Sequence, residues 1–449
     1  MKVTIIGGGS YQWGPTLLTD LLLTESFADG GHLVLEDIDA APLAVIERFA
    51  HKMIEHLGVN VTVSATTDQR AAVDGSDFVV VTISTGGFES MAVDLDVPER
   101  HGIAQTVGDS VGPGGINRAL RNIPVLVGIA HDMEELCPDA WMLNITNPMT
   151  TLTRSVCRET SIRAVGLCHE VGNFELDLAI AMRIPHTDIQ PTVSGVNHFP
   201  VITAMDIGGR DGFEVVREQV ESLGGLEALA PRADRDEPEP MSLLDWGLRN
   251  YLKLSLFDRW GVLPAAGDRH LAEFLPSILT EQSNWGASWG VKMTPIADRE
   301  GDQADFVRSV EEQLSGDRDL QAWSSGEMMA LVIDSLTTGT HRELPLNIPN
   351  AGQCPDLPAD AVVEAMCVVD ADGIRGRDQA RVPAAVAEIL RRHVATQELT
   401  VEAAISGDRA LVHQAIELDP LAGRGDLRDT EAMADELLAG AAKWLPQFA

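Results

Sequence analysis

Residues 3–10 read Val-Thr-Ile-Ile-Gly-Gly-Gly-Ser, and this stretch decides the fold. Its four β-branched residues predict a short buried strand, and the glycines that follow permit a tight turn. Residues 14–23 come next and predict a helix. Strand, glycine turn and helix in this order form a phosphate-binding unit, because a helix N-terminus offers free N–H groups to a pyrophosphate.

The same alternation continues through the first two hundred residues. Apolar runs predict strands at 33–37, 61–63, 78–83, 141–145 and 164–167, with helical patterns at 40–57, 117–135 and 149–159. Nearly continuous Val, Ile and Leu strands between helices indicate a parallel sheet that is buried on both faces. The predicted fold class is therefore α/β, a Rossmann-like doubly wound parallel sheet of the lactate and malate dehydrogenase type, with a second α+β lobe.

The charge excludes several classes of partner. The 449-residue chain has 33 Lys+Arg and 68 Asp+Glu, a net charge of −35, which repels nucleic acid and anionic membranes. No apolar run approaches the ~20 residues of a membrane span. The N-terminal stretch lacks a signal-peptide pattern, and five irregularly spaced cysteines argue against a disulfide framework. We expect a cytoplasmic protein, in which an anionic substrate would need a locally cationic pocket.

The glycine turn indicates a dinucleotide. Gly7 and Gly9 match the first two glycines of the G-x-G-x-x-G pattern, although Gln12 occupies the third position. Asp37 ends the second predicted strand, where an acid bonds the ribose hydroxyls and repels a 2′-phosphate. We therefore predict NAD, bound by these two glycines, Ser10 and Asp37. The alternative is a glycine turn in an ordinary α/β protein.

The second half of the chain has a different pattern. Longer helical stretches are predicted at 242–257, 270–279, 308–314 and 327–336, then strands at 344–348 and 362–369, then further helices. Residues 234–240 are acidic and proline-bearing, which predicts an exposed loop. No flexible linker separates the halves. We predict an NAD-binding domain at residues 1–196, interwoven with a substrate, metal and oligomerisation domain at residues 197–449.

Three motifs follow predicted strands. Asn144 and Asn147 lie at the end of one strand, where Asn144 could bind the cofactor and Asn147 the substrate, or where Asn147 merely caps a helix. Cys168 and His198 each follow a later strand, at the sheet edge where α/β ligands bind. A thiolate and an imidazole can hold a borderline divalent metal. The alternative for Cys168 is a small buried apolar residue.

Two further segments are candidates for the site. Residues 106–115 predict a glycine-rich loop that could close over a substrate, with Asp109 as an acid and Arg118 as an anion ligand on the next helix. The alternative is an exposed loop and a capped helix. Residues 267–274, Gly-Asp-Arg-His-Leu-Ala-Glu-Phe, hold four ionisable side chains among apolar ones. This density favours a site over a solvated helix start.

Taken in order, these motifs resemble the NAD-dependent glycosidases of glycoside hydrolase family 4. The resemblance rests on residues 7–10, 144–148, 168–170, 195–198, 267–274, 347–350 and 357–364, and covers about residues 3–375. It implies a route in which bound NAD⁺ oxidises the sugar at C3 and a base removes the C2 proton. The aglycone then leaves C1 by elimination, water adds, and the hydride returns. It also implies a Mn²⁺ ion on the C2 and C3 oxygens as a Lewis acid.

The resemblance assigns roles to individual residues. Cys168 and His198 would hold the metal, and Asn147 and His169 would contact the sugar. For the base we predict Asp268, in the Gly-Asp-Arg-His motif, with Tyr251 as the second candidate. Asp109 is our candidate for the acid.

The substrate depends on residues around the sugar. Family members that act on phosphorylated sugars follow the cysteine with Asn or Asp, whereas His169-Glu170 stand here. We predict an α-glycoside of a non-phosphorylated sugar. Alternatively, Arg118, Arg269 and His270 would pair with an acidic C6 group, as in a galacturonide, glucuronide or sulfoquinovoside.

Other functions share the nucleotide half. An NAD-dependent 2-hydroxy-acid dehydrogenase would need a substrate-binding arginine and a His–Asp pair but no metal thiolate. A protein that binds NAD without turnover would leave the clustered residues 267–274 unexplained. The resemblance further suggests a homodimer or homotetramer.

Overall fold

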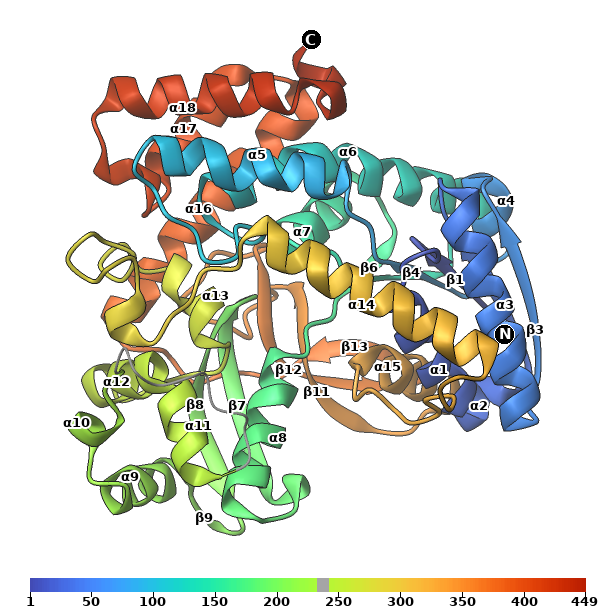
Figure 1. The fold of residues 1–449 in the computed structure, drawn as a ribbon, viewed down its shortest axis with the longest axis horizontal. Coiled ribbons are helices and arrows are strands. Elements are labelled where there is room, and N and C mark those ends of the chain that lie inside the picture. The colour runs from blue at the N-terminus through green and yellow to red at the C-terminus, as the bar shows by residue number, and fades with distance from the viewer. Residues whose placement is uncertain (232–241) are drawn as a thin grey trace.

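One mixed sheet of 13 strands runs through the described residues, 1–231 and 242–449, of the computed structural model (Figure 1). Its first half is parallel, in the order β3 (Asn60–Thr66), β2 (Asp29–Glu36), β1 (Lys2–Ile6), β4 (Phe78–Val81), β5 (Trp141–Asn144) and β6 (Arg163–Gly166). The order 3-2-1-4-5-6 is that of a doubly wound dinucleotide-binding sheet. The predicted Rossmann-like fold is confirmed.

The second half of the sheet is antiparallel and continues from β6. It consists of β11 (Arg342–Pro349), β12 (Val362–Asp370), β7 (Ile189–Val196), β8 (Phe199–Ile207) and β10 (Leu263–Pro264), with β13 (Gly373–Gly376) beside β12 and β9 (Arg210–Asp211) beside β8. The halves join where Asn347 of β11 lies opposite Gly166 of β6. The second lobe therefore extends the same sheet and adds helices to it.

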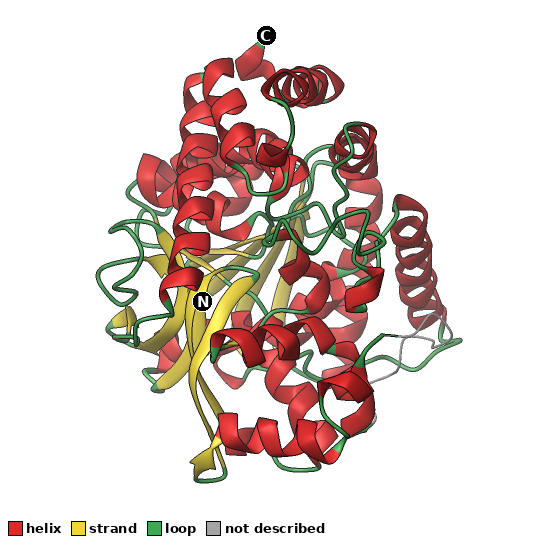
Figure 2. Ribbon diagram, turned by 90° about the vertical axis from the view of Figure 1, so that its left-hand side faces the viewer, coloured by secondary structure: helices red, strands yellow, loops and turns green. Residues whose placement is uncertain are grey.

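Side chains of the parallel strands alternate between two hydrophobic clusters. Val3 of β1 packs in the cluster that includes α1 (Trp13–Leu23) and α3 (Ala40–Leu57). Ile6 points to the opposite face and packs in the cluster that includes α6 (Gly112–Leu136). Because both faces are buried, these strands are apolar throughout rather than alternating, and helices lie on both sides of them (Figure 2).

The remaining helices complete the two layers. Those of the first half are α2 (Glu25–Ala28), α4 (Gln69–Val73), α5 (Gly87–Arg100), α7 (Met149–Glu159) and α8 (Glu170–Met182). Those of the second half are α9 (Gly212–Ser222), α10 (Leu226–Leu229), α11 (Leu243–Arg249), α12 (Tyr251–Trp260), α13 (Asp268–Glu273), α14 (Ile296–Ser315), α15 (Met328–Thr338), α16 (Ala384–Ser406), α17 (Arg409–Leu418) and α18 (Leu427–Gly440). The last three pack against α5 and α6, at the top of Figure 1.

Some sequence predictions differ from the structure. Residues 112–115 were expected in a loop that follows a strand, but they begin α6, and α5 precedes the segment. The glycines there serve close packing, since a Cβ on Gly114 would lie 2.5 Å from the carbonyl oxygen of Asp94 in α5. The helix predicted at 308–314 begins earlier, at Ile296. The loop predicted at 234–240 lies outside the described residues.

Within the described ranges, no helix is both long enough and apolar enough to cross a bilayer. All five cysteines are free thiols.

Candidate functional site

The glycine turn after β1 has the geometry of a phosphate cradle. Gly7 has φ +87°, and a Cβ there would lie 2.0 Å from the carbonyl oxygen of Thr82, so that only glycine fits. The backbone N–H of Gly9 donates to Asp37 Oδ2 at 3.0 Å, and a Cβ on Gly9 would lie 2.8 Å from that oxygen. Without side chains at these two positions, a ligand can approach the backbone of the turn closely.

The start of α1 completes this cradle. The N-cap residue Gln12 provides no side-chain cap, and Ser10 Oγ accepts a hydrogen bond from the N–H of Trp13 at 3.1 Å. Asp37 Oδ1 accepts from the N–H of Asp39, which fixes the carboxylate at the end of β2. A helix N-terminus beside a fixed acid fits a pyrophosphate and an adjacent ribose. The turn therefore fits a dinucleotide.

Asn144 does not fit the cofactor contact that we predicted. Its side chain is fully buried, and both Nδ2 donors are used by Thr146 O and Thr153 Oγ1, at 3.2 and 3.1 Å. Its Oδ1 accepts from the N–H of Thr146 at 2.9 Å. The side chain stabilises the turn between β5 and α7, and the prediction of direct cofactor contact is corrected to this role.

A pocket of about 380 Å³ lies where the second lobe meets the sheet, around α13. Its wall comes from α8, α11, α12, α13, the start of α14 and the segment before it. The charged side chains that line it are Glu170, Asp177, Arg249, Lys253, Asp268, Arg269, Lys292 and Arg299. Of the predicted site residues, Asp268, Arg269 and His270 line this pocket.

Asp268 has the environment of a general base. Its carboxylate accepts hydrogen bonds from the backbone N–H groups of Leu252 and Lys253, at 2.8 and 3.1 Å, in the first turn of α12. Burial raises the pKa of Asp268, the Lys253 ammonium and the two N–H groups lower it, and the result is about 6. A fixed carboxylate that is ionised at neutral pH can accept a proton in this pocket.

Tyr251 does not fit the role of second candidate for the base. Its ring packs against Trp289, with ring centroids 6.1 Å apart, and belongs to the hydrophobic cluster under α8 and α9. It is absent from the residues that line the described pocket. The only other tyrosine, Tyr11, lies in the glycine turn.

A hydrogen-bonded chain fixes the imidazole of His198. Ser110 Oγ donates to Asp109 Oδ1 at 2.7 Å and lies 2.6 Å from His198 Nδ1. Since the hydroxyl proton goes to the carboxylate, His198 Nδ1–H donates to the hydroxyl, and Nε2 carries the free lone pair. Burial and the neighbouring His270 lower the pKa of His198 to about 3. A neutral imidazole with an oriented lone pair suits a metal.

Asp109 does not fit the acid that we predicted. Burial raises its pKa, but His270, His198 and Arg118 lower it by more, and the pKa lies below its ordinary value. A general acid needs a raised pKa, because it must hold its proton until the leaving group departs. The ionised carboxylate instead accepts from Ser110 and, at 3.2 Å, from Asn147 Nδ2. Asp109 therefore positions neighbouring groups.

Asp109, His198 and His270 place one possible ligand atom each within 4.8 Å of one another, the group among the described residues that could hold a metal. The two imidazole rings are stacked, with centroids 3.8 Å and planes 28° apart. A metal must lie near the plane of each imidazole that binds it, so stacked rings cannot share an ion in this arrangement. His270 Nδ1 is buried without a hydrogen-bond partner.

Cys168 lies outside this group, at the end of β6 beside the buried residues Asn197 and Glu364. Burial and the nearby carboxyl groups raise the pKa of Cys168 well above its usual value, while a hydrogen bond from the Asn197 side chain lowers it. Asn197 Nδ2 also donates to Glu364 Oε2 at 3.3 Å, and burial raises the pKa of Glu364 to about 8. A thiol of this kind is a donor that a borderline divalent ion accepts once the thiol has lost its proton.

The remaining predicted contacts lie around this centre. Asn147 Oδ1 is buried and has no partner, so it can accept a hydrogen bond from a sugar hydroxyl. Arg118 donates from Nε to the carbonyl oxygen of Asn147 at 3.0 Å and does not line the pocket. His169 Nδ1 pairs with Glu327 at 2.8 Å and its ring stacks on Trp13, which turns it toward the cofactor side. Arg118 thus supports Asn147 through Nε, and direct binding of the substrate by its other nitrogens stays a prediction.

Comparison with known proteins identifies the family. The family model described as "Family 4 glycosyl hydrolase" matches residues 2–184, and the model of its C-terminal domain matches residues 193–422. The chain belongs to glycosyl hydrolase family 4. It is an enzyme of the glycosidase class, as the resemblance of its motifs predicts.

Full-length relatives of this family 4 chain carry different names. It is 33% identical to an alpha-galacturonidase from Lachnoclostridium phytofermentans, over 100% of this chain and 97% of the relative. It is 31% identical to an alpha-galactosidase from Bacillus subtilis, over 100% and 99%. A crystal structure of a 6-phospho-alpha-glucosidase from gut microorganisms, in complex with NAD and Mn²⁺, shares the fold with a TM-score of 0.81 at 21% identity, over 99% of both chains.

The structure adds three charged residues to which the family 4 motifs did not lead us to assign a role: Glu170 and Lys253, which line the pocket, and Glu364, which lies near Cys168. Glu170 Oε2 accepts from the N–H of Gly267 at 2.5 Å and ties α8 to the start of α13. Lys253 and Glu364 are each buried within apolar sequence, Leu-Lys-Leu and Val-Glu-Ala. A charged residue inside a helix or strand that is otherwise apolar was the signal available in the sequence.

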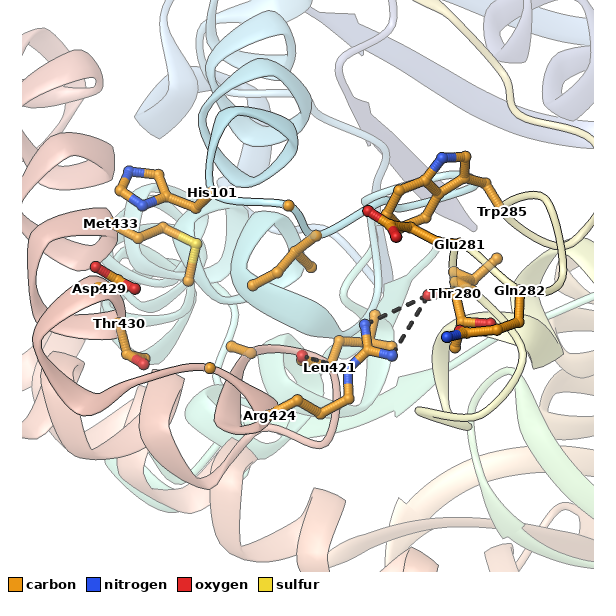
Figure 3. A pocket seen from close by; sticks show the side chains of 15 residues that line it. His101, Thr280, Glu281, Gln282, Trp285, Leu421, Arg424, Asp429, Thr430 and Met433 are labelled. Carbon is orange, nitrogen blue, oxygen red and sulfur yellow. Dashed lines mark hydrogen bonds between the residues drawn. The ribbon is translucent and has the colours of Figure 1, made fainter.

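A second pocket, of about 350 Å³, lies between the loop after α5 and the start of α18 (Figure 3). Trp285 and Met433 line it, and Arg424 donates to the carbonyl oxygen of Leu421 at 3.0 Å. His101, also on its wall, pairs with Glu436 at 3.0 Å. None of the predicted site residues lines this pocket.

Proposed function

We propose that this family 4 enzyme is an NAD- and metal-dependent glycosidase, and that its substrate is an α-glycoside of an acidic, unphosphorylated sugar. The observation that carries the proposal is the charge of the pocket around α13. Five cations line it, namely Arg249, Lys253, Arg269, Lys292 and Arg299, against the carboxylates of Glu170, Asp177 and Asp268. A chain with a net charge of −35 thus turns five of its 33 Lys and Arg side chains toward one pocket.

The relatives support an unphosphorylated sugar and leave two choices at C6. An alpha-galacturonidase accepts a sugar with a carboxylate at C6, whereas an alpha-galactosidase accepts a hydroxymethyl group there. Of these cations Lys253 is buried, and it donates one hydrogen bond among the described residues, so an uncharged sugar would leave its charge without an anionic partner. The cations therefore favour the acidic sugar, a galacturonide, glucuronide or sulfoquinovoside.

The glycine turn supports the binding of NAD, and the candidate metal ligands support the binding of a divalent metal. The glycine cradle and Asp37 would hold NAD, which accepts a hydride from the sugar C3 when bound. Cys168 and His198 Nε2 would hold a divalent metal, which polarises the sugar oxygens when bound. NAD and Mn²⁺ are present in the related 6-phospho-alpha-glucosidase structure.

The chain's own residues then act on the sugar. Asp268 removes the proton from C2 of the oxidised sugar, since its carboxylate is held by two N–H groups and is ionised at neutral pH. Asn147 Oδ1 accepts a hydrogen bond from a sugar hydroxyl and orients the ring. Asp109 and Ser110 hold His198 in the tautomer that leaves Nε2 free.

The test is cleavage of aryl α-glycosides that share one leaving group. The panel holds galacturonide, glucuronide, sulfoquinovoside, galactoside and glucoside, each with and without NAD⁺ and Mn²⁺. We expect cleavage that requires both cofactors and is fastest on an acidic sugar. Binding of NAD⁺ without cleavage of any glycoside would overturn the proposal and favour a 2-hydroxy-acid dehydrogenase.

Two predictions about the whole protein extend the proposal. The homodimer or homotetramer suggested by the resemblance is testable by light scattering. The cytoplasmic location is supported by five unpaired thiols, because a metal-binding Cys168 needs a reducing compartment.

A further inference from the structure

Lys253 differs from the other cations of the pocket around α13 by its burial. Only 3% of its surface is exposed, whereas Arg269 and Lys292 are exposed and Arg249 and Arg299 are half-buried. In a site that water does not reach, the attraction between a cation and an anionic ligand is much stronger than at the surface. Lys253 is therefore the cation whose charge a bound sugar meets with the least screening.

The ammonium of Lys253 is also poorly paired within the protein. Its Nζ donates one hydrogen bond, to the carbonyl oxygen of Ala265 at 3.1 Å, and lies 5.1 Å from the centre of the Phe174 ring. An ammonium has three donors, so two of them have no acceptor among the described residues. The carboxylates of Asp268 and Glu170 are near but form no ion pair with it there.

Lys253 lines the same pocket as Asp268, the candidate base, and is bonded to it through the backbone. The N–H of the same residue donates to Asp268 Oδ1 at 3.1 Å. A sugar whose C2 lies at Asp268 therefore has its other ring substituents within the same pocket as the ammonium. Ala265 and Phe174 hold the side chain from two sides, which fixes the direction of the remaining donors.

We propose that Lys253 is the residue that determines substrate specificity, by donating hydrogen bonds from its buried ammonium to the acid group at C6 of the sugar. This inference rests on the proposed function and names the residue that selects the acidic sugar. A neutral C6 hydroxymethyl group leaves the charge of Lys253 unpaired in a dry pocket, so neutral sugars are rejected.

The test compares Lys253→Met with the wild type on 4-nitrophenyl α-D-galacturonide and α-D-galactoside. Methionine keeps the length of the apolar stem and removes the charge. Any effect of the lost charge on Asp268 acts on both substrates equally, so the ratio of their kcat/KM values isolates recognition of C6. We expect this ratio to fall about 10- to 100-fold, the effect of a lost hydrogen bond to a charged group.

Arg259→Met is the matched control, because it removes a cation from the same helix, α12, that stacks on Trp289 and does not line the pocket. We expect it to change the ratio less than about threefold. An unchanged ratio in Lys253→Met, or an equal fall in Arg259→Met, would overturn the inference. NAD⁺ affinity measured by fluorescence reports whether each variant is folded.

Binding separates failure of this inference from failure of the proposed function. Calorimetry with D-galacturonate and D-galactose needs no turnover. A wild type that cleaves nothing but binds galacturonate through Lys253 would refute the reaction and support the binding site. In the opposite case, the wild type cleaves the galactoside and binds galacturonate no better than galactose. That result would refute the role of Lys253 but would support the glycosidase reaction.

Discussion

Two of the pockets among residues 1–231 and 242–449 have similar volumes, about 380 and 350 Å³, but they differ in how their charges are paired. In the pocket of Figure 3, Arg424 is bound to carbonyl oxygens and His101 to Glu436. In the pocket around α13, the Lys253 ammonium has a single acceptor and the His270 Nδ1 has none. Pocket size does not distinguish a catalytic site from a packing gap, whereas buried groups without partners do.

The largest effect that the comparison predicts is at Asp268. Asp268→Asn removes the proton acceptor, and we expect kcat to fall about 10²- to 10⁴-fold on the best aryl glycoside. Asp177→Asn is the matched control, since Asp177 is a carboxylate on the same wall without hydrogen bonds from α12. A loss of similar size in both variants would mean that pocket charge, rather than Asp268, supports turnover.

A smaller effect is expected at the metal. Because the raised pKa of Cys168 keeps the thiol protonated before the metal arrives, Mn²⁺ binding should release a proton. Calorimetry in two buffers of different ionisation enthalpy measures this release. We expect Cys168→Ser to abolish it and to weaken Mn²⁺ binding by at least about tenfold.

The buried thiol Cys354 provides the control for this experiment, since its Sγ accepts a hydrogen bond from Ser194 and belongs to no group of possible metal ligands among the described residues. Cys354→Ser should leave proton release and affinity as in the wild type. Equal Mn²⁺ affinity in wild type and Cys168→Ser would instead place the ion at His198 with Asp109.

The pH dependence tests the base independently of substitutions. Asp268 acts only when ionised, and its pKa is raised to about 6, so kcat/KM should decrease as the pH falls through 6. We expect about a tenfold loss for each pH unit below that value. A profile of kcat/KM that stays flat down to pH 5 would exclude Asp268 as the base.

The smallest effect on activity is expected in the pocket of Figure 3. Met433 is 1% exposed, and Met433→Ala should lower the free energy of unfolding by about 2–5 kcal/mol through the cavity it leaves. We expect kcat/KM to stay within about twofold of the wild type, measured well below the melting temperature. A selective loss of kcat/KM without a loss of stability would show that the two pockets are coupled.

The sequence predicted those features that depend on neighbouring residues along the chain. The turn at Gly7 and Gly9 was predictable because a positive φ and a close backbone approach require glycine locally. Asp268, Arg269 and His270 were found because their spacing in one short segment was unusual. The strands were predictable because burial on both faces makes them uniformly apolar.

Features that depend on distant parts of the chain could not be predicted. The wall around Lys253 comes from five helices and the loops between them, so no spacing relates Lys253 to Glu170 or Arg299. The acid role predicted for Asp109 does not agree with its lowered pKa, which depends on His270, His198 and Arg118, residues that the fold brings together. The sequence shows that residue 109 is an aspartate, but it does not show which charged groups surround this carboxylate in the fold.

The junction of β6 and β11 has a consequence for how the enzyme works. Asn347 pairs with Gly166, and this pairing joins two halves into one hydrogen-bonded sheet. The parallel half carries the glycine turn, and the antiparallel half lies beside the pocket that contains Lys253. A continuous sheet provides no hinge about which two domains could rotate, in contrast to enzymes that assemble their catalytic groups by domain closure. The separation between hydride acceptor and proton acceptor is then set once, when the chain folds. Turnover would depend on side chains and short loops alone, and sugars would enter and leave a site whose frame stays still.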